Sequence, residues 1–397
     1  MGVAWLILKG LGITLLFLVV AVFLAATIVP RFLDRIYYEG PPSDHFDGGR
    51  FFNPDGDEDT LRPTPETSAA PRSRFGFFAR YLLGNDGRPD WPTKVEVTPA
   101  KPAARVEGER MVATWVGHAT MLVQTQGLNI LTDPVWSDTA GPFGFGPRRV
   151  AAPGIRFEDL PKIDVVLLSH NHYDHLDLTT LKRLWARDRP RIVTSLGNDT
   201  ILRSAGVEAT ALDWNGRLAV APNVEVVAAR NHHWGSRWFT DRNRALWSAF
   251  VVRLPGGNLF FAGDTGMGDG RWPAEAAALG PVRLALIPIG AFRFVEGQMG
   301  SGSHIGPADA VEVHRRLGAA MSLPIHWGTF RLSYEAWDTP PKMLELAMAC
   351  TKQAGFAAVT HGEPVEVPPY AAPAAVTEMP RDNLLTCLAT HGGGTLK

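Results

Sequence analysis

Four residues with metal-binding side chains lie within six positions of one another: His170, His172, Asp174 and His175. They follow the apolar run 163–168, which is typical of a buried β-strand. Because side chains two apart on an extended chain point the same way, His170 and His172 can bind one cation. Asp174 and His175 can turn towards a second. Two neighbouring cations can share a hydroxide and hold the attacking and leaving oxygens of an ester, so this segment predicts a binuclear hydrolytic site.

Further ligands must come from other strand ends, because one strand end cannot complete two metal sites. Three more apolar runs end in ligand-type residues: His232 and His233, Asp264, and His326. A carboxylate such as Asp264 can bridge two cations, and this mixture of donors suits zinc, although iron or manganese would also be accepted. The pattern leaves His232 and His233 as alternatives. Any one of these residues is more often a hydrogen-bonded core or loop residue, but four such strand ends predict one metal centre at a sheet edge.

Strands alternating with short helices predict an α/β domain over residues 110–366. A helix is expected directly after the first metal motif, with Asp177 or Thr179 as its cap. We find no internal repeat. The elements that deliver the candidate ligands therefore belong to one large domain.

An uncharged apolar run covers residues 10–30, and we assign residues 1–36 as an N-terminal membrane anchor. As a helix, a run of about 20 residues crosses a hydrocarbon core. The alternative is a cleaved signal peptide, but the run is long and no small-x-small site ends it. Lys9 lies on one side and Arg31 and Arg35 on the other, so the membrane face of the enzyme stays open. We expect a single-pass protein of a bacterial inner membrane.

Residues 37–109 are expected to be an arm and a flexible linker. The arm covers residues 43–54, and the acidic, proline-rich segment 55–71 is typical of a linker. Residues 72–83 predict a basic, aromatic amphipathic helix, which either lies in a membrane interface or docks on its own domain. Residues 367–397 are expected to form a weakly structured C-terminal tail.

The overall charge excludes one class of function. The formal net charge is −1 at pH 7, so there is no basic field to attract nucleic acid. The two cysteines are too few for a disulfide framework and lack the spacing of a thiolate zinc site. Cys350 falls in a helical pattern and is expected to be a small core residue, and both thiols are compatible with a reducing compartment.

The sequence resembles the metallo-β-lactamase superfamily, and within it the N-acyl-phosphatidylethanolamine-hydrolysing phospholipase D group and its bacterial relatives. The resemblance rests on WVGHAT, LTDPVWS, LPKIDVVLLSHNHYDHLD, LDW, HHWGSR with DRNRALW, AGDTG, PIGAF and IHWGTF, and covers most of the chain from SDHFDG to about Pro341. It implies a four-layer αββα sandwich with two metal ions, expected to be Zn²⁺, at one sheet edge. The stretch RFVEGQMGSGSH departs from the family's usual Pro-Arg-aromatic stretch, at a place where substrate would be handled.

The resemblance also implies a role for each candidate residue. The first metal would be bound by His170, His172 and His233, the second by Asp174, His175 and His326, and Asp264 would be shared. The match to the family's His-Trp pair selects His233 over His232. His118 and Asp133 are expected to lie behind the ligands and orient their imidazoles. A buried structural hydrogen bond is the alternative for both.

His304 and four tryptophans are further candidates near the substrate. His304 precedes Gly306 and Pro307, the expected start of a helix whose N–H groups can hold an anion. The resemblance makes it a candidate for contacting the scissile phosphate or protonating the leaving alkoxide, and a helix-capping histidine is the alternative. An acyl-chain groove is a further hypothesis, although such aromatic residues are usually core; its candidates are Trp234, Trp238, Trp247 and Trp327.

These observations together predict a membrane-anchored, zinc-dependent phosphodiesterase of the phospholipase D type. A metal-bridging hydroxide would attack the phosphorus of a glycerophospholipid, with Asp174, Asp264 and His304 as the catalytic residues. The partners we expect are a phospholipid substrate and a membrane, with no nucleic acid, and a homodimer stays open. The alternatives are a lactone, amide or thioester hydrolase on the same fold, and a non-enzymatic membrane-bound module. The second is disfavoured because all seven ligand positions are occupied.

Overall fold

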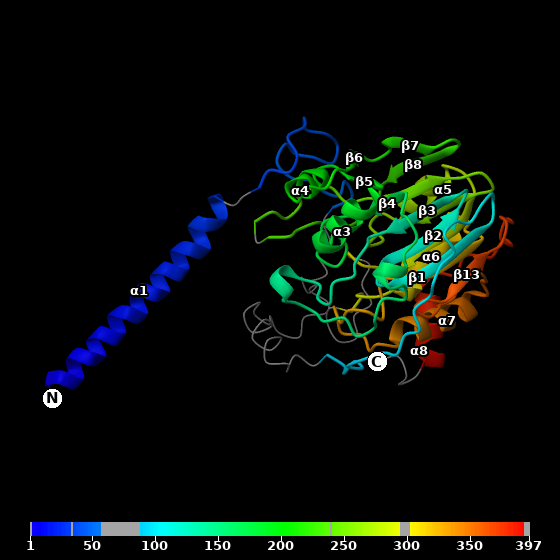
Figure 1. The fold of residues 1–397 in the computed structure, drawn as a ribbon. Coiled ribbons are helices and arrows are strands. Elements are labelled where there is room, and N and C mark those ends of the chain that lie inside the picture. The colour runs from blue at the N-terminus through cyan, green and yellow to red at the C-terminus, as the bar shows by residue number, and fades with distance from the viewer. Residues whose placement is uncertain (1, 33–34, 57–87, 239, 294–301, 393–397) are drawn as a thin grey trace.

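The computed structural model of the protein describes residues 2–32, 35–56, 88–238, 240–293 and 302–392. Within these residues, two β-sheets stack face to face and helices cover the outer face of each sheet (Figure 1). The αββα sandwich that the resemblance implies is confirmed. The expected linker and the amphipathic segment 72–83 lie almost entirely outside the described residues.

The first sheet has seven strands in the order β13-β1-β2-β3-β4-β5-β6. Neighbours pair antiparallel from β13 to β3 and parallel from β3 to β6. Helices α3 and α4 pack on its outer face. The bounds are β1 Met111–Gly117, β2 Thr120–Thr125, β3 Leu128–Thr132, β4 Val165–Leu168, α3 Leu178–Asp188, β5 Arg191–Ser195, α4 Asn198–Ser204, β6 Thr210–Leu212 and β13 Pro364–Val367.

Strand β4, which leads to the first metal motif, is buried on both faces. Val165 and Leu167 belong to the core between the sheets, whereas Val166 and Leu168 belong to the core under α3 and α4. This explains why its sequence is apolar without alternation. The following helix α3 is capped by Asp177, whose side chain accepts the N–H groups of Thr179 and Thr180.

The second sheet has six strands in the order β12-β11-β10-β9-β8-β7. Its inner face closes the main core against the first sheet, and α5 and α6 cover its outer side, with α7 and α8 packed beside α6. The bounds are β7 Arg217–Ala221, β8 Val224–Ala229, β9 Ala249–Arg253, β10 Asn258–Phe261, α5 Trp272–Ala277, β11 Val282–Pro288, α6 Pro307–Leu317, β12 Met321–Ile325 and α7 Thr339–Thr351. Two short 3₁₀ turns cover Pro142–Gly144 and Phe157–Asp159.

The C-terminal segment is more ordered than the sequence indicated. Helix α8 (Arg381–Gly392) buries Leu384 and Leu388 in the main core, and a disulfide joins Cys350 of α7 to Cys387 of α8. The expectation of a weakly structured tail was therefore wrong, and so was the expectation of two free thiols. The two cysteines are 37 residues apart, and only the packing of α8 on α7 brings their Cα atoms to 6.3 Å.

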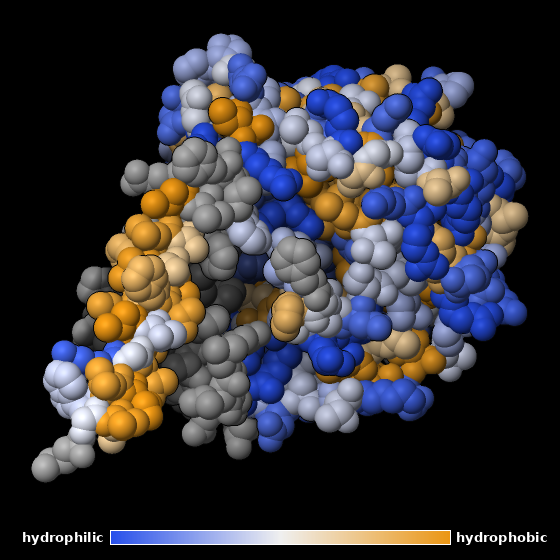
Figure 2. Space-filling model, turned by 60° about the vertical axis from the view of Figure 1, so that its left-hand side comes forward, coloured by the Kyte–Doolittle hydropathy of each residue, from blue (hydrophilic) through white to orange (hydrophobic). Residues whose placement is uncertain are grey.

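The N-terminal helix α1 (Gly2–Phe32) differs from the rest of the chain in its surface. Residues Gly2–Ala25 have a mean hydropathy of 2.6 and none of this stretch is buried against the protein. The helix leads away from the sandwich in Figure 1, and apolar side chains gather along it in Figure 2. By length and composition it can cross a membrane. Residues 35–56 then return to the sandwich and pack against it.

Candidate metal centre

Candidate ligands from both sheets meet at one edge of the sandwich. His170, His172, Asp174 and His175 follow β4. His233 follows β8, Asp264 follows β10 and His326 follows β12. The structure brings these seven residues together, and apart from His172 and Asp174 they are almost completely buried. Asp174 keeps 14% of its side chain exposed, which leaves it accessible from a cavity.

The first group of donor atoms consists of three imidazole nitrogens. His172 Nδ1 lies 2.9 Å from His170 Nε2 and 3.4 Å from His233 Nε2. Burial, the largest cause, and neighbouring imidazoles lower the pKa of His170 and His233 well below its usual value. Burial likewise lowers the pKa of His172 to about 3. These side chains are therefore neutral at pH 7, which is the form of imidazole that binds a cation.

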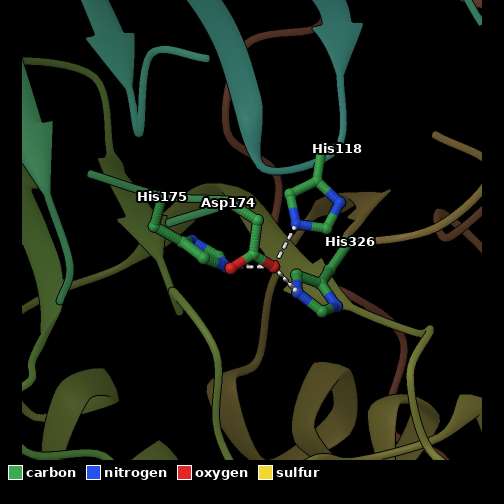
Figure 3. Close-up of side chains that lie close together, drawn as sticks. All are labelled: His118, Asp174, His175 and His326. Atoms are coloured by element: carbon green, nitrogen blue, oxygen red, sulfur yellow. Dashed lines mark hydrogen bonds and ion pairs between the residues drawn. The ribbon is translucent and has the colours of Figure 1, made fainter. Parts of the chain in front are cut away.

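The second group surrounds the carboxylate of Asp174, as Figure 3 shows. Asp174 Oδ2 lies 3.5 Å from His326 Nε2 and 3.6 Å from His175 Nε2. Burial lowers the pKa of His326, but the charge of Asp264 and hydrogen bonds to Asp174 and Asp264 outweigh it and raise the pKa to about 9. The carboxylates therefore concentrate negative charge beside these two imidazoles.

Asp264 lies between the two groups. Its Oδ2 atom is 2.9 Å from His326 Nε2 and 3.1 Å from His175 Nε2. The same oxygen is 4.0 Å from His170 Nε2 and 4.0 Å from His233 Nε2. Burial raises the pKa of Asp264, but the histidines outweigh that effect and hold the pKa well below its usual value. An ionised carboxylate in this position can bridge two cations.

Hydrogen bonds on the outer side fix which ring nitrogen of each histidine faces inward. His175 Nδ1 donates to Asp133 Oδ2 at 2.6 Å, and His233 Nδ1 donates to the Ser303 carbonyl at 2.8 Å. His170 Nδ1 lies 2.8 Å from the Ser169 hydroxyl, which itself donates to Asp133. Each of these rings therefore turns the Nε2 lone pair inward. Sequence reasoning found Asp133 but missed Ser169 and Ser303, for which no spacing pattern gives a signal.

The donor set fits a pair of cations. Asp264 Oδ1 is buried and has no hydrogen-bond partner among the described residues. Buried polar atoms without hydrogen bonds are costly, and a cation held beside His175 and His326 would satisfy this oxygen. Imidazole nitrogens with two carboxylates are donors that zinc accepts.

His118 lies behind the candidate ligands, but it supports a carboxylate where an imidazole was expected. Its Nε2 lies 2.9 Å from Asp174 Oδ2, so it contacts a carboxylate rather than the outer nitrogen of an imidazole (Figure 3). Its carbonyl also accepts the N–H of His326 at 3.0 Å. Both His118 (φ 53°) and His326 (φ 62°) have left-handed backbones, as does Asp133 (φ 26°). Such conformations cost of order 1–3 kcal/mol each and cluster at functional sites.

A cavity of about 270 Å³ opens beside these groups. His172, Asp174 and Asp264 line it together with His304, whose Nδ1 lies 3.7 Å from Asp264 Oδ2. Burial is the largest cause that lowers the pKa of His304 to about 4. The remaining lining residues are Ala140, Tyr173, Trp234, Ser236, Ala291 and Leu332. Residues 294–301, which make up most of the stretch that differs from the family's usual sequence, lie outside the described residues.

Two further expectations concern the choice between His232 and His233 and the tryptophans of an acyl-chain groove. His233 lies among the ligands, whereas the His232 ring turns away and pairs with Asp55 at 3.0 Å. Of the four tryptophans considered for an acyl groove, Trp234 lines the cavity. Trp247 is fully buried in another cluster, and Trp327 stacks on Trp115 in the core. For these two the core alternative holds.

Comparisons with known proteins agree with this geometry. The family model described as Beta-lactamase superfamily domain matches residues 128–327, half of the chain. An uncharacterised protein of Mycobacterium tuberculosis is 36% identical over 247 residues, covering 60% of this chain and 64% of that protein, so the chain spans less than two thirds of this relative. N-acyl-phosphatidylethanolamine-hydrolyzing phospholipase D 1 of Caenorhabditis elegans is 36% identical over 272 residues, covering 64% of this chain and 75% of that protein.

A solved structure shares the fold. The isothiocyanate hydrolase from Delia radicum gut bacteria covers 64% of this chain and 98% of its own, with a TM-score of 0.51 at 18% identity. The match of the superfamily model over half the chain, with the αββα sandwich and the histidine and aspartate cluster at its edge, shows that the chain belongs to the metallo-β-lactamase superfamily.

Proposed function

We propose that the protein is a metal-dependent hydrolase that cleaves a phosphodiester bond of a glycerophospholipid, with N-acyl-phosphatidylethanolamine as the substrate to test. The observation that carries the proposal is the position of Asp264 Oδ2, within 4.0 Å of imidazole nitrogens from both donor groups. Support for the lipid comes from the name of the Caenorhabditis elegans relative. Two bound cations, proposed to be Zn²⁺, would supply an activated water and neutralise charge on phosphoryl oxygens.

The chain's own residues divide the remaining work. One cation would be held by His170, His172 and His233, the other by Asp174, His175 and His326, and Asp264 would contact both. Asp174 and Asp264 line the cavity, so their carboxylates can orient a water and accept its proton. His118 holds Asp174 in place through its 2.9 Å hydrogen bond.

His304 is the residue best placed to contact the substrate. It lines the cavity and lies just before α6, whereas the candidate metal ligands follow the ends of strands. A neutral imidazole there can donate a hydrogen bond to a phosphoryl oxygen, and once protonated it can give a proton to the leaving alkoxide. In either role His304 would contact an oxygen atom of the bound substrate and would form no covalent bond with it.

The experiment that tests the proposal combines metal analysis with lipid turnover. The purified protein is analysed for bound zinc, iron and manganese and then incubated with a bacterial lipid extract. We expect two equivalents of metal, and phosphatidic acid with an N-acylethanolamine as products detected by mass spectrometry. A protein that turns over a lactone, amide or thioester panel and leaves every phosphodiester intact would refute the lipid assignment while keeping the metal centre.

We further propose that α1 anchors the enzyme and that the sandwich faces an oxidising compartment. The anchor is supported by the apolar surface of α1. The compartment is supported by the disulfide between Cys350 and Cys387, because disulfides persist outside reducing cytosol. For a bacterial inner membrane, the proposal corresponds to an enzyme domain on the outer face.

A thiol-labelling experiment tests this orientation. A membrane-impermeant maleimide reagent is added to cells and to detergent-solubilised membranes, each with and without prior reduction. We expect labelling in both preparations, and in each case only after reduction. Cysteines that are labelled without reduction in solubilised membranes and protected in intact cells would place the domain in the cytoplasm.

A further inference from the structure

Residues 37–56, which contain the expected arm 43–54 and are called the arm from here on, pack onto the loop that carries His233. Phe46 and Phe51 of the arm form a buried cluster with Leu246 and Trp247 of the β8–β9 loop, and each is at most 1% exposed. Burial of two phenylalanine side chains is strongly stabilising, so this cluster fixes the arm to the sandwich. The arm is therefore a built part of the domain and not a loose connection to α1.

Hydrogen bonds also join the arm to this loop. The backbone N–H of Phe51 donates to the Asn243 carbonyl at 2.7 Å, and the guanidinium of Arg244 donates to the Gly49 carbonyl at 3.0 Å. Nearer to α1, the Tyr37 hydroxyl donates to Asp241 Oδ2 at 2.9 Å. The other oxygen of Asp241 accepts the Ser236 hydroxyl at 2.7 Å, and Ser236 lines the cavity. The arm thus contacts the middle of the β8–β9 loop, and through Asp241 it is linked to Ser236 in the wall of the cavity.

The end of the arm reaches a metal-ligand candidate directly. Asn53 is 6% exposed, and its side-chain amide donates to the carbonyl of His233 at 2.9 Å. The same amide accepts the indole N–H of Trp247 at 3.2 Å, which fixes its orientation. The His233 ring is thereby held from two directions, by Ser303 at Nδ1 and by Asn53 at the backbone.

A second contact joins the arm to the loop that carries Asp264. Asp55 accepts the N–H of Asp269 at 2.6 Å and pairs with His232 Nδ1 at 3.0 Å. The backbone of His232 in turn bonds to Thr265 and Gly266, directly after Asp264. Asn53 and Asp55 therefore touch both loops that bring second-sheet ligands to the centre.

We propose that residues 37–56 are a positioning element for the metal centre, in which Asn53 sets the position of His233 and Asp55 that of the Asp264 loop. This inference rests on the proposed metal-dependent function. Neither residue touches the substrate cavity or a ligating atom, so both are positioning residues. The site of this domain is incomplete without a segment that lies outside residues 128–327, the span of the superfamily model.

The test measures Co²⁺ binding to the full chain in detergent, by competition with a chromophoric chelator and by the visible Co²⁺ spectrum. The variant Asn53→Asp keeps the acceptor for Trp247 and loses the donor to His233. The matched control is Asn258→Asp, because Asn258 is also buried and donates to a backbone carbonyl, that of Leu279, at the start of β10. Asp55→Ala is the second variant, because it removes the contacts to His232 and to the N–H of Asp269.

We expect Asn53→Asp to bind one of two Co²⁺ ions about tenfold more weakly and to show an altered Co²⁺ spectrum. Residues that support metal ligands typically contribute 10–100-fold in metal affinity, and the expected loss is at the low end of that range. Turnover should show a lower kcat with an unchanged KM, whereas Asn258→Asp should bind Co²⁺ as the wild type does. Asp55→Ala should show the same loss, in smaller measure. If Asn53→Asp binds both ions normally, or if Asn258→Asp loses as much, the positioning role is overturned.

The outcomes also separate this inference from the proposed function. A wild type that binds two Co²⁺ ions and leaves phosphodiesters intact would refute the lipid reaction, while the loss in Asn53→Asp would still support the arm's role. A wild type that hydrolyses lipid while Asn53→Asp binds metal normally would refute the arm's role alone. A wild type that binds no Co²⁺ would overturn both.

Discussion

The two sheets contribute to the metal centre in different ways. The first sheet supplies four ligands from six consecutive positions after β4, beginning at His170 and ending at His175. The second sheet supplies His233, Asp264 and His326 from three separate strand ends. A contiguous turn is held by its own sheet, whereas three separate loops need contacts from elsewhere to stay together.

Those supporting contacts follow the same division. Asp133 and Ser169, which hold His175 and His170, directly follow the neighbouring strands β3 and β4 of the first sheet. The groups that hold His233 are Ser303, which precedes α6, and Asn53 of the N-terminal arm. The first-sheet half is thus locally determined, and the second-sheet half depends on distant parts of the chain.

Asp264 joins the two halves, so its replacement should have the largest effect. Asp264→Ala removes a carboxylate whose Oδ2 atom lies near imidazoles of both groups. We expect loss of both metal equivalents and a fall in turnover of more than roughly 1,000-fold, beyond the loss from removing one transition-state donor. Metal analysis and a phosphodiester assay provide the measurement.

The control for Asp264 is another buried carboxylate. Asp309→Asn changes a residue that is 5% exposed and pairs with Arg381 of α8, away from the ligands. It should keep both metal equivalents. If Asp264→Ala also keeps both, Asp264 does not join the two halves.

His304 tests whether the second-sheet side also handles substrate. His304→Gln should keep the metals and lower turnover by roughly 10²–10⁴-fold if His304 protonates the leaving group. In that case the loss should be large for an alkyl phosphodiester and small for a p-nitrophenyl ester, whose leaving group needs no proton. An equal loss for both substrates would instead assign His304 to binding the phosphoryl oxygens. A variant with wild-type turnover of both would exclude either role.

Asp133 tests the locally determined half. Asp133→Asn weakens the acceptor of the His175 Nδ1 proton, and supporting carboxylates of this kind are typically worth 10–100-fold in metal affinity. We expect the cation of the Asp174, His175 and His326 group to be lost first on titration with a chelator, because Asp133 contacts His175 directly and His170 only through Ser169. Simultaneous loss of both cations would show that the two groups are not supported separately.

The difference between the halves also explains how much could be predicted from the sequence. The β4 strand and its metal motif could be predicted because the apolar run and the ligands are contiguous in the sequence. Asp264 could be predicted in the same way, because it also follows an apolar run. The choice of His233 over His232 came from the family resemblance, since both follow β8. The structure gives the physical reason, because the His232 ring is paired with Asp55.

Contacts between distant segments could not be read from the chain. Asn53 is 180 residues from His233, and no periodicity relates an amide in an arm to a carbonyl after a strand. The disulfide was missed for the same reason, because Cys387 approaches Cys350 only once α8 packs on α7. Apart from Ser169, the contacts that were missed come from segments outside the two sheets.

Weakening the docking of the arm should have the smallest effect. The titration of His45 allows that docking to be measured through the pH dependence of stability. Its Nε2 lies 2.8 Å from Asp213 and its Nδ1 2.6 Å from Asp44, with the ring stacked on Trp214. Burial lowers the pKa of His45, but its hydrogen bonds to Asp213 and Asp44 outweigh burial and raise the pKa above 6.5. Protonated His45 therefore stabilises the docked arm.

The sign of the pH dependence follows from linkage. A histidine whose pKa is higher in the folded protein contributes its full stabilisation below pH 6.5, the unfolded value, and loses it as pH rises through the folded value. We expect the free energy of unfolding of the wild type to exceed that of His45→Gln most at acidic pH, with the difference shrinking as pH rises. Denaturant titrations of both proteins across this range provide the measurement. A difference that stays constant with pH would show that His45 holds the arm by packing on Trp214 and not by charge, and the second-sheet half would then owe its support to neutral contacts such as that of Asn53.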